Sequence, residues 1–135
     1  MSPRAYPQPD RTTINAPLLD GWASGRLMVQ RCTACERTFY YTRTMCPHCW
    51  SPDFEWIEAR RSGTVVSFTL VQRPIHDVFA DEVPVVLAEI EMPEGFSLLA
   101  RVMCDDPSML ATGRTVSLVR ADCAAKYPLP TFTLS

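Results

Sequence analysis

The fold is decided by residues 32–49, which read CTACERTFYYTRTMCPHC. This stretch opens with the pair Cys32 and Cys35 and closes, after ten intervening residues, with the pair Cys46 and Cys49. A Cys-x-x-Cys turn lets two sulfurs converge on one ion, and two such turns supply the four thiolate ligands of a tetrahedral zinc site. The spacing therefore predicts one structural zinc ion bound by these four cysteines, with a short hairpin between the two turns.

Other interpretations of the cysteines stay open at this stage. The four thiols are also compatible with two disulfides or with an iron-binding, rubredoxin-like redox centre, and His48 in the second turn can replace one cysteine as a ligand. Four thiolates leave no open position for water, so the site is expected to stabilise the fold and not to catalyse a reaction. Cys104 and Cys123 stand alone in the sequence. They are expected to be buried small side chains, with a catalytic nucleophile as the alternative.

The residues around the two cysteine pairs have the composition of β-strands. Residues 26–33 lead into the first pair and residues 38–42 lead toward the second, which predicts a zinc ribbon over residues 26–61. Large aromatic side chains crowd this segment, and they are expected to form its small core or to pack it against the following domain. They are Phe39, Tyr40, Tyr41, Trp50 and Trp56.

Residues 1–25 are expected to form an N-terminal arm and a docking helix. Three prolines among the first 13 residues indicate an extended or disordered arm. Asn15 can cap a short helix with Pro17 in its first turn, and Gly25 can end it. The apolar side chains of this helix are predicted to bind a partner protein, with packing on the chain's own core as the alternative. These side chains are Leu18, Leu19 and Trp22.

From residue 62 onward the pattern changes to short β-rich runs separated by Pro and Gly. The runs cover residues 64–72, 85–91, 96–102, 115–120 and 130–134. Such punctuation is typical of antiparallel β-barrels, and we expect a five-stranded barrel of the OB type over residues 62–135, with one helical turn at residues 107–110. The predicted class is therefore mainly β, with a short N-terminal helix, a ribbon and a C-terminal barrel.

Composition excludes several classes of protein. Hydrophobic residues make up 47% of the chain and charged residues 21%, as in ordinary folded proteins. The longest apolar runs are far shorter than the roughly 20 residues of a membrane-spanning helix, and the first dozen residues lack the apolar segment of an export signal. We therefore expect a cytoplasmic protein without membrane contact, in a reducing compartment where paired cysteines bind metal more often than they form disulfides.

The distribution of charge argues against nucleic-acid binding. Residues 26–61 hold six Arg against four acidic residues, whereas residues 62–135 hold five basic against nine acidic residues. Because phosphate neutralisation supplies much of the affinity for nucleic acids, a binding domain normally carries a strong cationic footprint. The expected barrel has the opposite sign. A single-stranded nucleic-acid-binding module is kept as the alternative function, since OB barrels bind such ligands in other proteins.

Several further stretches carry a joint pattern. They are GRLMVQRC (residues 25–32), CPHC (46–49), SGTVVS (62–67), the loop from Arg73 to Pro84 with His76 and Phe79, and LPTF (129–132). Together they resemble the OB-fold acyl-CoA-associated proteins that carry an N-terminal rubredoxin-like zinc ribbon, a family once known as a domain of unknown function. Residues 98–101, which read LLAR, depart from the family pattern, in which many members have a small polar residue or Asn. No role of that residue is carried over.

The resemblance implies a non-catalytic accessory subunit in a hetero-oligomer with a thiolase-like enzyme, or with a MaoC-like enoyl-CoA hydratase, acting on acyl-CoA thioesters. The ribbon and the helix would dock the partner, and the OB fold is a candidate for contact with acyl-CoA. The residues agree, because paired carboxylates, a Gly-rich phosphate loop and an open metal site are all missing from the sequence. We therefore expect no catalytic residues and no enzymatic activity of the chain by itself.

Coenzyme A is strongly anionic, and guanidinium groups bind phosphate in a bidentate manner. Arginines in and after the ribbon are therefore candidates for contacts with its phosphates, with solvated surface charge as the alternative. These candidates are Arg31, Arg37, Arg43, Arg60 and Arg61.

Overall fold

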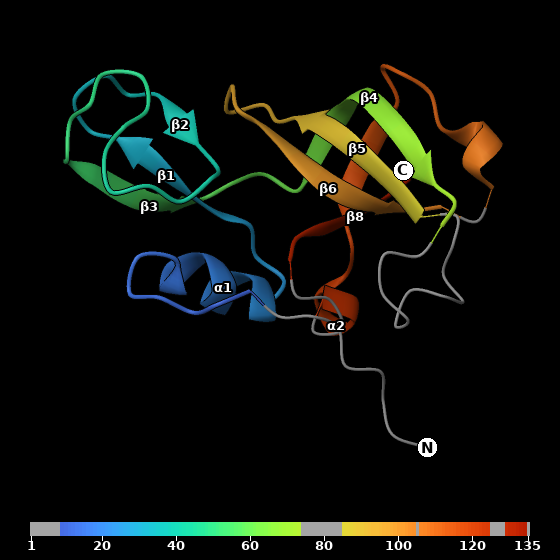
Figure 1. The fold of residues 1–135 in the computed structure, drawn as a ribbon, viewed down its shortest axis with the longest axis horizontal. Coiled ribbons are helices and arrows are strands. Elements are labelled where there is room, and N and C mark those ends of the chain that lie inside the picture. The colour runs from blue at the N-terminus through green and yellow to red at the C-terminus, as the bar shows by residue number, and fades with distance from the viewer. Residues whose placement is uncertain (1–8, 74–84, 105, 125–128, 135) are drawn as a thin grey trace.

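The chain folds into a small three-stranded sheet followed by a closed five-stranded barrel (Figure 1). The computed structural model describes residues 9–73, 85–104, 106–124 and 129–134. The elements are α1 (Ala16–Ala23), β1 (Met28–Cys32), β2 (Thr38–Phe39), β3 (Phe54–Glu58), β4 (Ser62–Val71), β5 (Val85–Glu91), β6 (Ser97–Met103), the 3-10 helix η2 (Pro107–Met109), β7 (Thr115–Leu118), α2 (Ala121–Ala124) and β8 (Thr131–Leu134). This architecture confirms the predicted mainly β class. Within the described residues, no helix combines the length and hydropathy that a membrane crossing requires.

The ribbon is built on β1, which lies between β2 and β3 in an antiparallel sheet. Strands β1 and β2 form the predicted hairpin, whereas the sequence pattern does not predict β3. β3 pairs along the whole of β1, from Met28 opposite Glu58 to Cys32 opposite Phe54. This second neighbour makes β1 a central strand, which explains why even the polar Gln30 is fully buried.

The barrel strands follow the order β4-β5-β6-β8-β7, and pairing of β7 with β4 closes the circle. Neighbouring strands are antiparallel except β6 and β8, which run parallel. Strand β4 pairs with β5 along most of its length and with β7 through its first residues, and a bulge between Val65 and Ser67 bends it across the barrel. The five-stranded barrel and the helical turn at η2 confirm the sequence predictions.

Alternate residues of the strands fill the barrel interior. The cross-strand partners Ile90 and Leu98 are both buried there. Gly63 of β4 faces the same interior, and a Cβ atom at this position would lie 2.7 Å from side-chain atoms of both Ile90 and Met92. Gly63 is therefore required by close packing of the first residues of β4 against the β5 strand.

Helix α1 packs its apolar face into the chain's own core. Leu18 and Trp22 have 6% and 2% of their surfaces exposed, and they belong to the same buried cluster as Val29 of β1 and Val65 of β4. Leu19 is half-buried against this cluster. The free apolar face expected for a docking helix is therefore not formed, because the ribbon and the barrel together supply the surface that covers these side chains.

The ends of α1 follow the sequence signals in part. Gly25 adopts a φ of 77° after the helix, and its N–H donates to the carbonyl oxygen of Trp22 at 2.8 Å. The next N–H donates to the carbonyl oxygen of Gly21 at 2.9 Å, which completes a Schellman motif that requires a left-handed residue. Asn15 occupies the N-cap position without a side-chain capping bond, and its Oδ1 instead accepts the N–H of Thr12 at 2.8 Å.

The described end of the N-terminal arm is tied to α1. Both terminal nitrogens of Arg11 donate to the carboxylate of Asp20, at 2.5 and 2.7 Å, and these bonds lower the pKa of Asp20. Residues 1–8 of the predicted arm lie outside the described residues.

Several hydrogen bonds join the ribbon to the barrel. The guanidinium of Arg61 donates to the carbonyl oxygen of Gly25 at 2.6 Å and to that of Val119 at 2.9 Å, so it bridges the end of α1 and the end of β7. The hydroxyl oxygen of Tyr41 accepts the backbone N–H of Leu99 in β6 at 3.1 Å. Together with the shared apolar cluster, these bonds fix the ribbon on one end of the barrel (Figure 1).

Candidate metal centre

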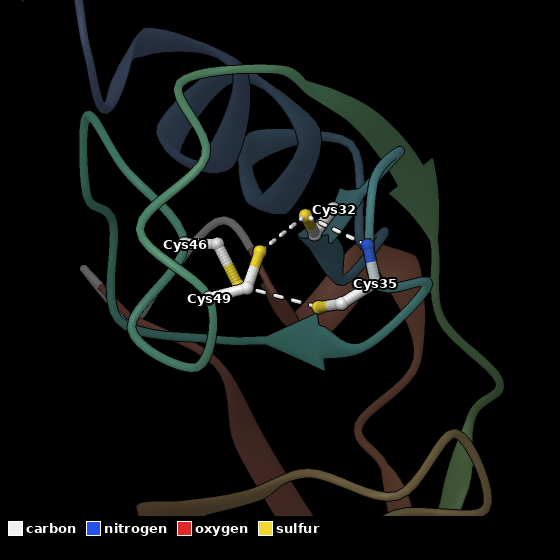
Figure 2. Close-up of side chains that lie close together, drawn as sticks. All are labelled: Cys32, Cys35, Cys46 and Cys49. Carbon is white, nitrogen blue, oxygen red and sulfur yellow. Dashed lines mark hydrogen bonds between the residues drawn. The ribbon is translucent and has the colours of Figure 1, made fainter.

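The four predicted ligands meet beside the ribbon sheet (Figure 2). Cys32 is the last residue of β1, Cys35 follows it in the first turn, and Cys46 and Cys49 come from the second turn. The four Sγ atoms all lie within 4.8 Å of one another. Cys32 and Cys46 are buried, Cys35 is half-buried and Cys49 is exposed, so the centre lies near the surface with its inner side closed.

The two Cys-x-x-Cys turns have the same backbone geometry. In the first knuckle, Cys32 to Glu36, the last N–H donates to the first carbonyl oxygen at 3.0 Å. In the second knuckle, Cys46 to Trp50, the corresponding bond is 2.9 Å long. Glu36 and Trp50, which end the knuckles, adopt φ angles of 66° and 67° in the left-handed region. The chain reverses at these residues, which directs both sulfurs of each knuckle to the same point.

The positions of the sulfurs fit a tetrahedral thiolate site. The Sγ atoms of Cys32 and Cys49 are 3.5 Å apart, and those of Cys35 and Cys46 are 3.6 Å apart. Zinc–sulfur bonds of about 2.3 Å in a tetrahedron place the sulfurs about 3.8 Å from one another, so the four thiolates can hold one ion with small adjustments. Disulfide bonds need a separation of about 2.05 Å, so the arrangement of the sulfurs does not support the two-disulfide alternative.

Backbone N–H groups beside the sulfurs favour the thiolate form, whereas the closeness of the sulfurs to one another opposes it. The N–H of Cys35 donates to Sγ of Cys32 at 3.4 Å and lowers the pKa of the Cys32 thiol to about 6. The N–H of Ser51 lowers the pKa of Cys49, but the other sulfurs raise it more strongly, to about 12. Because four thiolates this close repel one another, a bound cation is the natural counter-charge for the group.

A buried glutamine positions the segment that leads to the second knuckle. Nε2 of Gln30 donates to the carbonyl oxygen of Arg43 at 2.7 Å, and Oε1 accepts the N–H of Arg43 at 2.9 Å. Sequence reasoning missed this contact because a glutamine in a strand usually faces solvent. The available signal was its spacing: Gln30 lies two residues before Cys32, on the face of β1 that carries the first ligand.

Two of the candidate arginines are engaged within the chain. Arg31 forms ion pairs with Glu36 at 3.6 Å and with Glu55 at 3.3 Å, and its side chain is 34% exposed. Arg61 donates to the two carbonyl oxygens that join α1 to the barrel. A phosphate group would have to compete with these partners. Arg31 and Arg61 therefore contribute to holding the fold together.

The other three candidate arginines lie at the surface. Arg37, Arg43 and Arg60 are all exposed. Nη1 of Arg37 lies 3.3 Å from Nδ1 of His48 in the second knuckle. His48 is exposed, and the four sulfurs complete the ligand set without its imidazole. This geometry favours the four-cysteine interpretation over replacement of one cysteine by His48.

The ribbon aromatics divide between interior and surface. Phe39 packs with the buried sulfurs of the centre, and Tyr40 belongs to the main core. Trp56 is half-buried and meets Phe54 edge to face. Trp50 departs from the expectation of a core residue, since 75% of its surface is exposed.

The isolated cysteines do not extend the centre. Cys104 is half-buried, and its Sγ donates to the carbonyl oxygen of Asp106 at 2.9 Å. The side chain of Cys123 and the whole of His76 lie outside the described residues, as does most of the loop from Arg73 to Pro84. The nucleophile alternative for Cys123 therefore stays a prediction without a structural test.

A four-cysteine ribbon joined to a closed five-stranded OB barrel defines a class of two-part β proteins. Comparison with family models matches each part in turn. Residues 19–55 match the model described as "ChsH2, rubredoxin-like zinc ribbon domain", and residues 56–120 match "ChsH2, C-terminal OB-fold domain". The chain belongs to this ChsH2 family, also called the DUF35 family, which confirms the resemblance seen in the sequence.

Individual relatives extend this assignment. A Thermomonospora curvata protein named "Probable enoyl-CoA hydratase alpha subunit" is 32% identical over 126 residues, covering 93% of this chain but 39% of that protein. The benzoylsuccinyl-CoA thiolase subunit BbsA of Thauera aromatica is 28% identical in a 120-residue alignment, with 78% of this chain and 78% of that protein covered. A solved structure titled "Ltp2-ChsH2(DUF35) aldolase" matches with a TM-score of 0.78 and 32% identity, covering 94% of this chain and 98% of that chain.

Proposed function

We propose that this protein is a non-catalytic accessory subunit of an enzyme complex that acts on acyl-CoA thioesters. A thiolase-type enzyme is the proposed partner, and an enoyl-CoA hydratase is the alternative partner. The observation that carries the proposal is the match to the ChsH2-containing aldolase, because it covers almost the whole of both chains at 32% identity. The relationship to a thiolase subunit points to the same kind of assembly.

The proposed role of the metal is structural. One zinc ion bound by the four cysteines would hold the two knuckles together and would thereby order the surface that meets the partner. Thiolate ligands from all four cysteines would leave no coordination position for a substrate. The reaction would therefore take place in the partner enzyme, and this chain would contribute binding surface and shape.

Contact of the OB fold with acyl-CoA is a further part of the proposal, and the ribbon beside the barrel supplies candidate contacts for the phosphates of coenzyme A. Among the candidate arginines, Arg37, Arg43 and Arg60 have exposed side chains that form no bond to a carboxylate or carbonyl oxygen of the described residues. We retain these three as candidate contacts for the coenzyme A phosphates. A cytoplasmic location, where acyl-CoA thioesters and reduced cysteines coexist, is part of the same proposal.

Co-purification tests the proposed function directly. The chain would be expressed with the acyl-CoA enzymes encoded beside it, captured by a tag, and analysed by size-exclusion chromatography with light scattering. We expect one thiolase-type or hydratase-type enzyme to elute with it in a fixed ratio, and the complex to turn over an acyl-CoA thioester. A chain that stays alone with every such enzyme, yet retards single-stranded DNA at ~150 mM salt, would point to the nucleic-acid alternative.

A further inference from the structure

The second knuckle presents an exposed tryptophan on a rigid backbone. Trp50 is 75% exposed, which is the largest exposed fraction among the large apolar side chains that the structure describes. Its φ of 67° lies in the left-handed region, which is unfavourable for a bulky aromatic residue. The bond from its N–H to Cys46, and the bond from the N–H of Cys46 to Ser51, hold this conformation, at 2.9 Å each.

The first knuckle provides an internal comparison. Glu36 has the same position relative to its cysteines and the same backbone conformation, with a φ of 66°. Its side chain is solvated and pairs with Arg31 at 3.6 Å. A polar residue at this position therefore satisfies the fold. The tryptophan at the equivalent position of the second knuckle adds an apolar surface that the knuckle itself does not need.

Three exposed residues belong to the second knuckle or directly precede it, and we call them the knuckle patch: Met45, His48 and Trp50. Met45 directly precedes the knuckle and is 45% exposed. The guanidinium of Arg37 lies against His48 at 3.3 Å. Residues 37–52 contain two arginines and no acidic residue. The patch is therefore apolar at its centre and positively charged beside it.

We propose that Trp50 is the anchor with which the second knuckle enters an apolar pocket, rimmed by carboxylates, on the thiolase-type subunit. This inference rests on the proposed function and names the contact. Tryptophan and arginine are among the residues enriched at the energetic centres of interfaces. A tryptophan on a knuckle fixed by a metal ion loses little conformational freedom on binding, so most of its burial would contribute to affinity. Arg37 and Arg43, with no acidic residue between positions 37 and 52, fit a partner surface of opposite charge.

The left-handed backbone makes a sharp test, because glycine prefers this conformation. Replacement of Trp50 by glycine removes the side chain and relieves the backbone, so Trp50→Gly is expected to fold, bind zinc and melt at the same or a higher temperature than wild type. The same change weakens the complex by about 30-fold or more if Trp50 is an interface anchor. Glu36→Gly is the matched control, since it relieves the same strain in the first knuckle and leaves Trp50 in place.

The Kd would be measured by isothermal titration calorimetry with the purified thiolase-type enzyme that co-purifies with the wild-type chain. Trp50→Asn, which tolerates a left-handed backbone and keeps a polar side chain, is the second variant should the glycine variant lose its zinc. Met109→Ala, in η2 at the opposite end of the barrel, controls for general loss of apolar surface (Figure 1).

The expected result is weak binding by both Trp50 variants and unchanged binding by the Glu36 and Met109 controls. A folded Trp50→Gly or Trp50→Asn chain that binds with wild-type affinity would overturn the anchor while leaving the accessory-subunit function intact. Self-association of the isolated chain that disappears in Trp50→Gly would also overturn it, since the pocket would then lie on a second copy. Failure of the wild-type chain to bind any such enzyme would remove the proposed function and the anchor together.

Discussion

The side-chain amide of Gln30 bonds both the N–H and the carbonyl oxygen of Arg43, thirteen positions further along the chain. These are the two groups that a neighbouring strand would bond in a sheet. The backbone pairing of β1 with β2 ends at Gln30 and Phe39. Beyond this point the Gln30 side chain takes the place of a strand backbone and bonds the segment at Arg43. The segment that delivers Cys46 to the metal centre is thereby held against β1.

Replacement of Gln30 by Met tests this role. Methionine is similar to glutamine in length but is apolar, so it leaves both backbone groups of Arg43 without their partners. We expect the free energy of unfolding to fall by about 1–3 kcal/mol, measured by urea denaturation of the metal-loaded protein. Gln72→Met is the matched control, because Gln72 is exposed. Equal denaturation midpoints for Gln30→Met and wild type would show that the two bonds contribute nothing.

Tyr41 joins the ribbon to the edge of β6, and its removal should be visible at one amide. Strand β8 pairs with β6 through residues 101–103, so the N–H of Leu99 faces the ribbon and donates to the Tyr41 hydroxyl at 3.1 Å. Tyr41→Phe keeps the ring and removes the acceptor. We expect faster hydrogen exchange at the Leu99 amide, by a factor of roughly 2 to 10 for a bond of about 0.5–1.5 kcal/mol.

The Leu118 amide is the internal reference for that measurement, since it donates to the carbonyl oxygen of Arg61 at 2.7 Å and not to the Tyr41 hydroxyl. Its exchange should be the same in both proteins. Exchange at Leu99 that does not respond to Tyr41→Phe would mean that the Tyr41 hydroxyl does not protect this amide and that other contacts hold the ribbon on the barrel.

Arg61 and Arg60 are neighbours in sequence with different predicted effects. The Arg61 guanidinium donates to the carbonyl oxygens of Gly25 and Val119. Within the described residues, Arg60 is bonded through its backbone N–H alone, which donates to the carboxylate of Glu94 at 2.6 Å. Arg61→Met should therefore lower the free energy of unfolding by about 1–3 kcal/mol, and Arg60→Met should leave it nearly unchanged. Thermal denaturation of both variants makes the comparison.

The Arg60→Met and Arg61→Met variants also distinguish a residue that contacts the ligand from one that stabilises the fold. If Arg60 meets coenzyme A phosphates, Arg60→Met should weaken acyl-CoA binding to the complex without a change in melting temperature. Arg61→Met should act in the reverse manner, with a lower melting temperature and little direct effect on binding by the folded protein. An unchanged melting temperature for Arg61→Met would show that its two carbonyl contacts do not hold α1 on the barrel.

The metal ligands and the barrel strands could be predicted from the sequence, because both depend on residues that are close together in the chain. Each knuckle closes within five residues, so the Cys-x-x-Cys spacing was sufficient to place the ligands of the metal centre. The barrel strands were also recognisable, because proline and glycine separate short β-rich runs. These features depend on neighbours in the chain, and the structure contains them in the predicted order.

Features that depend on tertiary contact were missed or reversed. For Leu18 and Trp22 the sequence leaves docking on a partner and packing on the chain's own core both open, because it does not reveal that the ribbon and the barrel share one core with α1. Trp50 was assigned to the core by its size, yet a left-handed turn carries it to the surface. Gln30 shows the same limit in a polar residue, since its partner Arg43 belongs to a segment without regular structure.

The metal centre itself yields the most direct test. Cys32 is buried, its thiol has a pKa lowered to about 6, and it begins the first knuckle as the last residue of β1. A serine in its place would supply a poorer ligand for zinc and would leave three thiolates around the ion. Because the ribbon and barrel share one apolar cluster, we expect loss of the ion to lower the melting temperature of the whole chain.

Elemental analysis by plasma mass spectrometry would measure the result. Freshly purified wild type should carry one zinc per chain, Cys32→Ser should carry much less, and treatment of wild type with a strong chelator should reproduce the lower melting temperature of the variant. Cys104→Ser is the matched control, since Cys104 lies outside the four-sulfur group and should keep its zinc. Iron in place of zinc would favour the redox alternative, whereas full zinc content in Cys32→Ser would exclude Cys32 as a ligand.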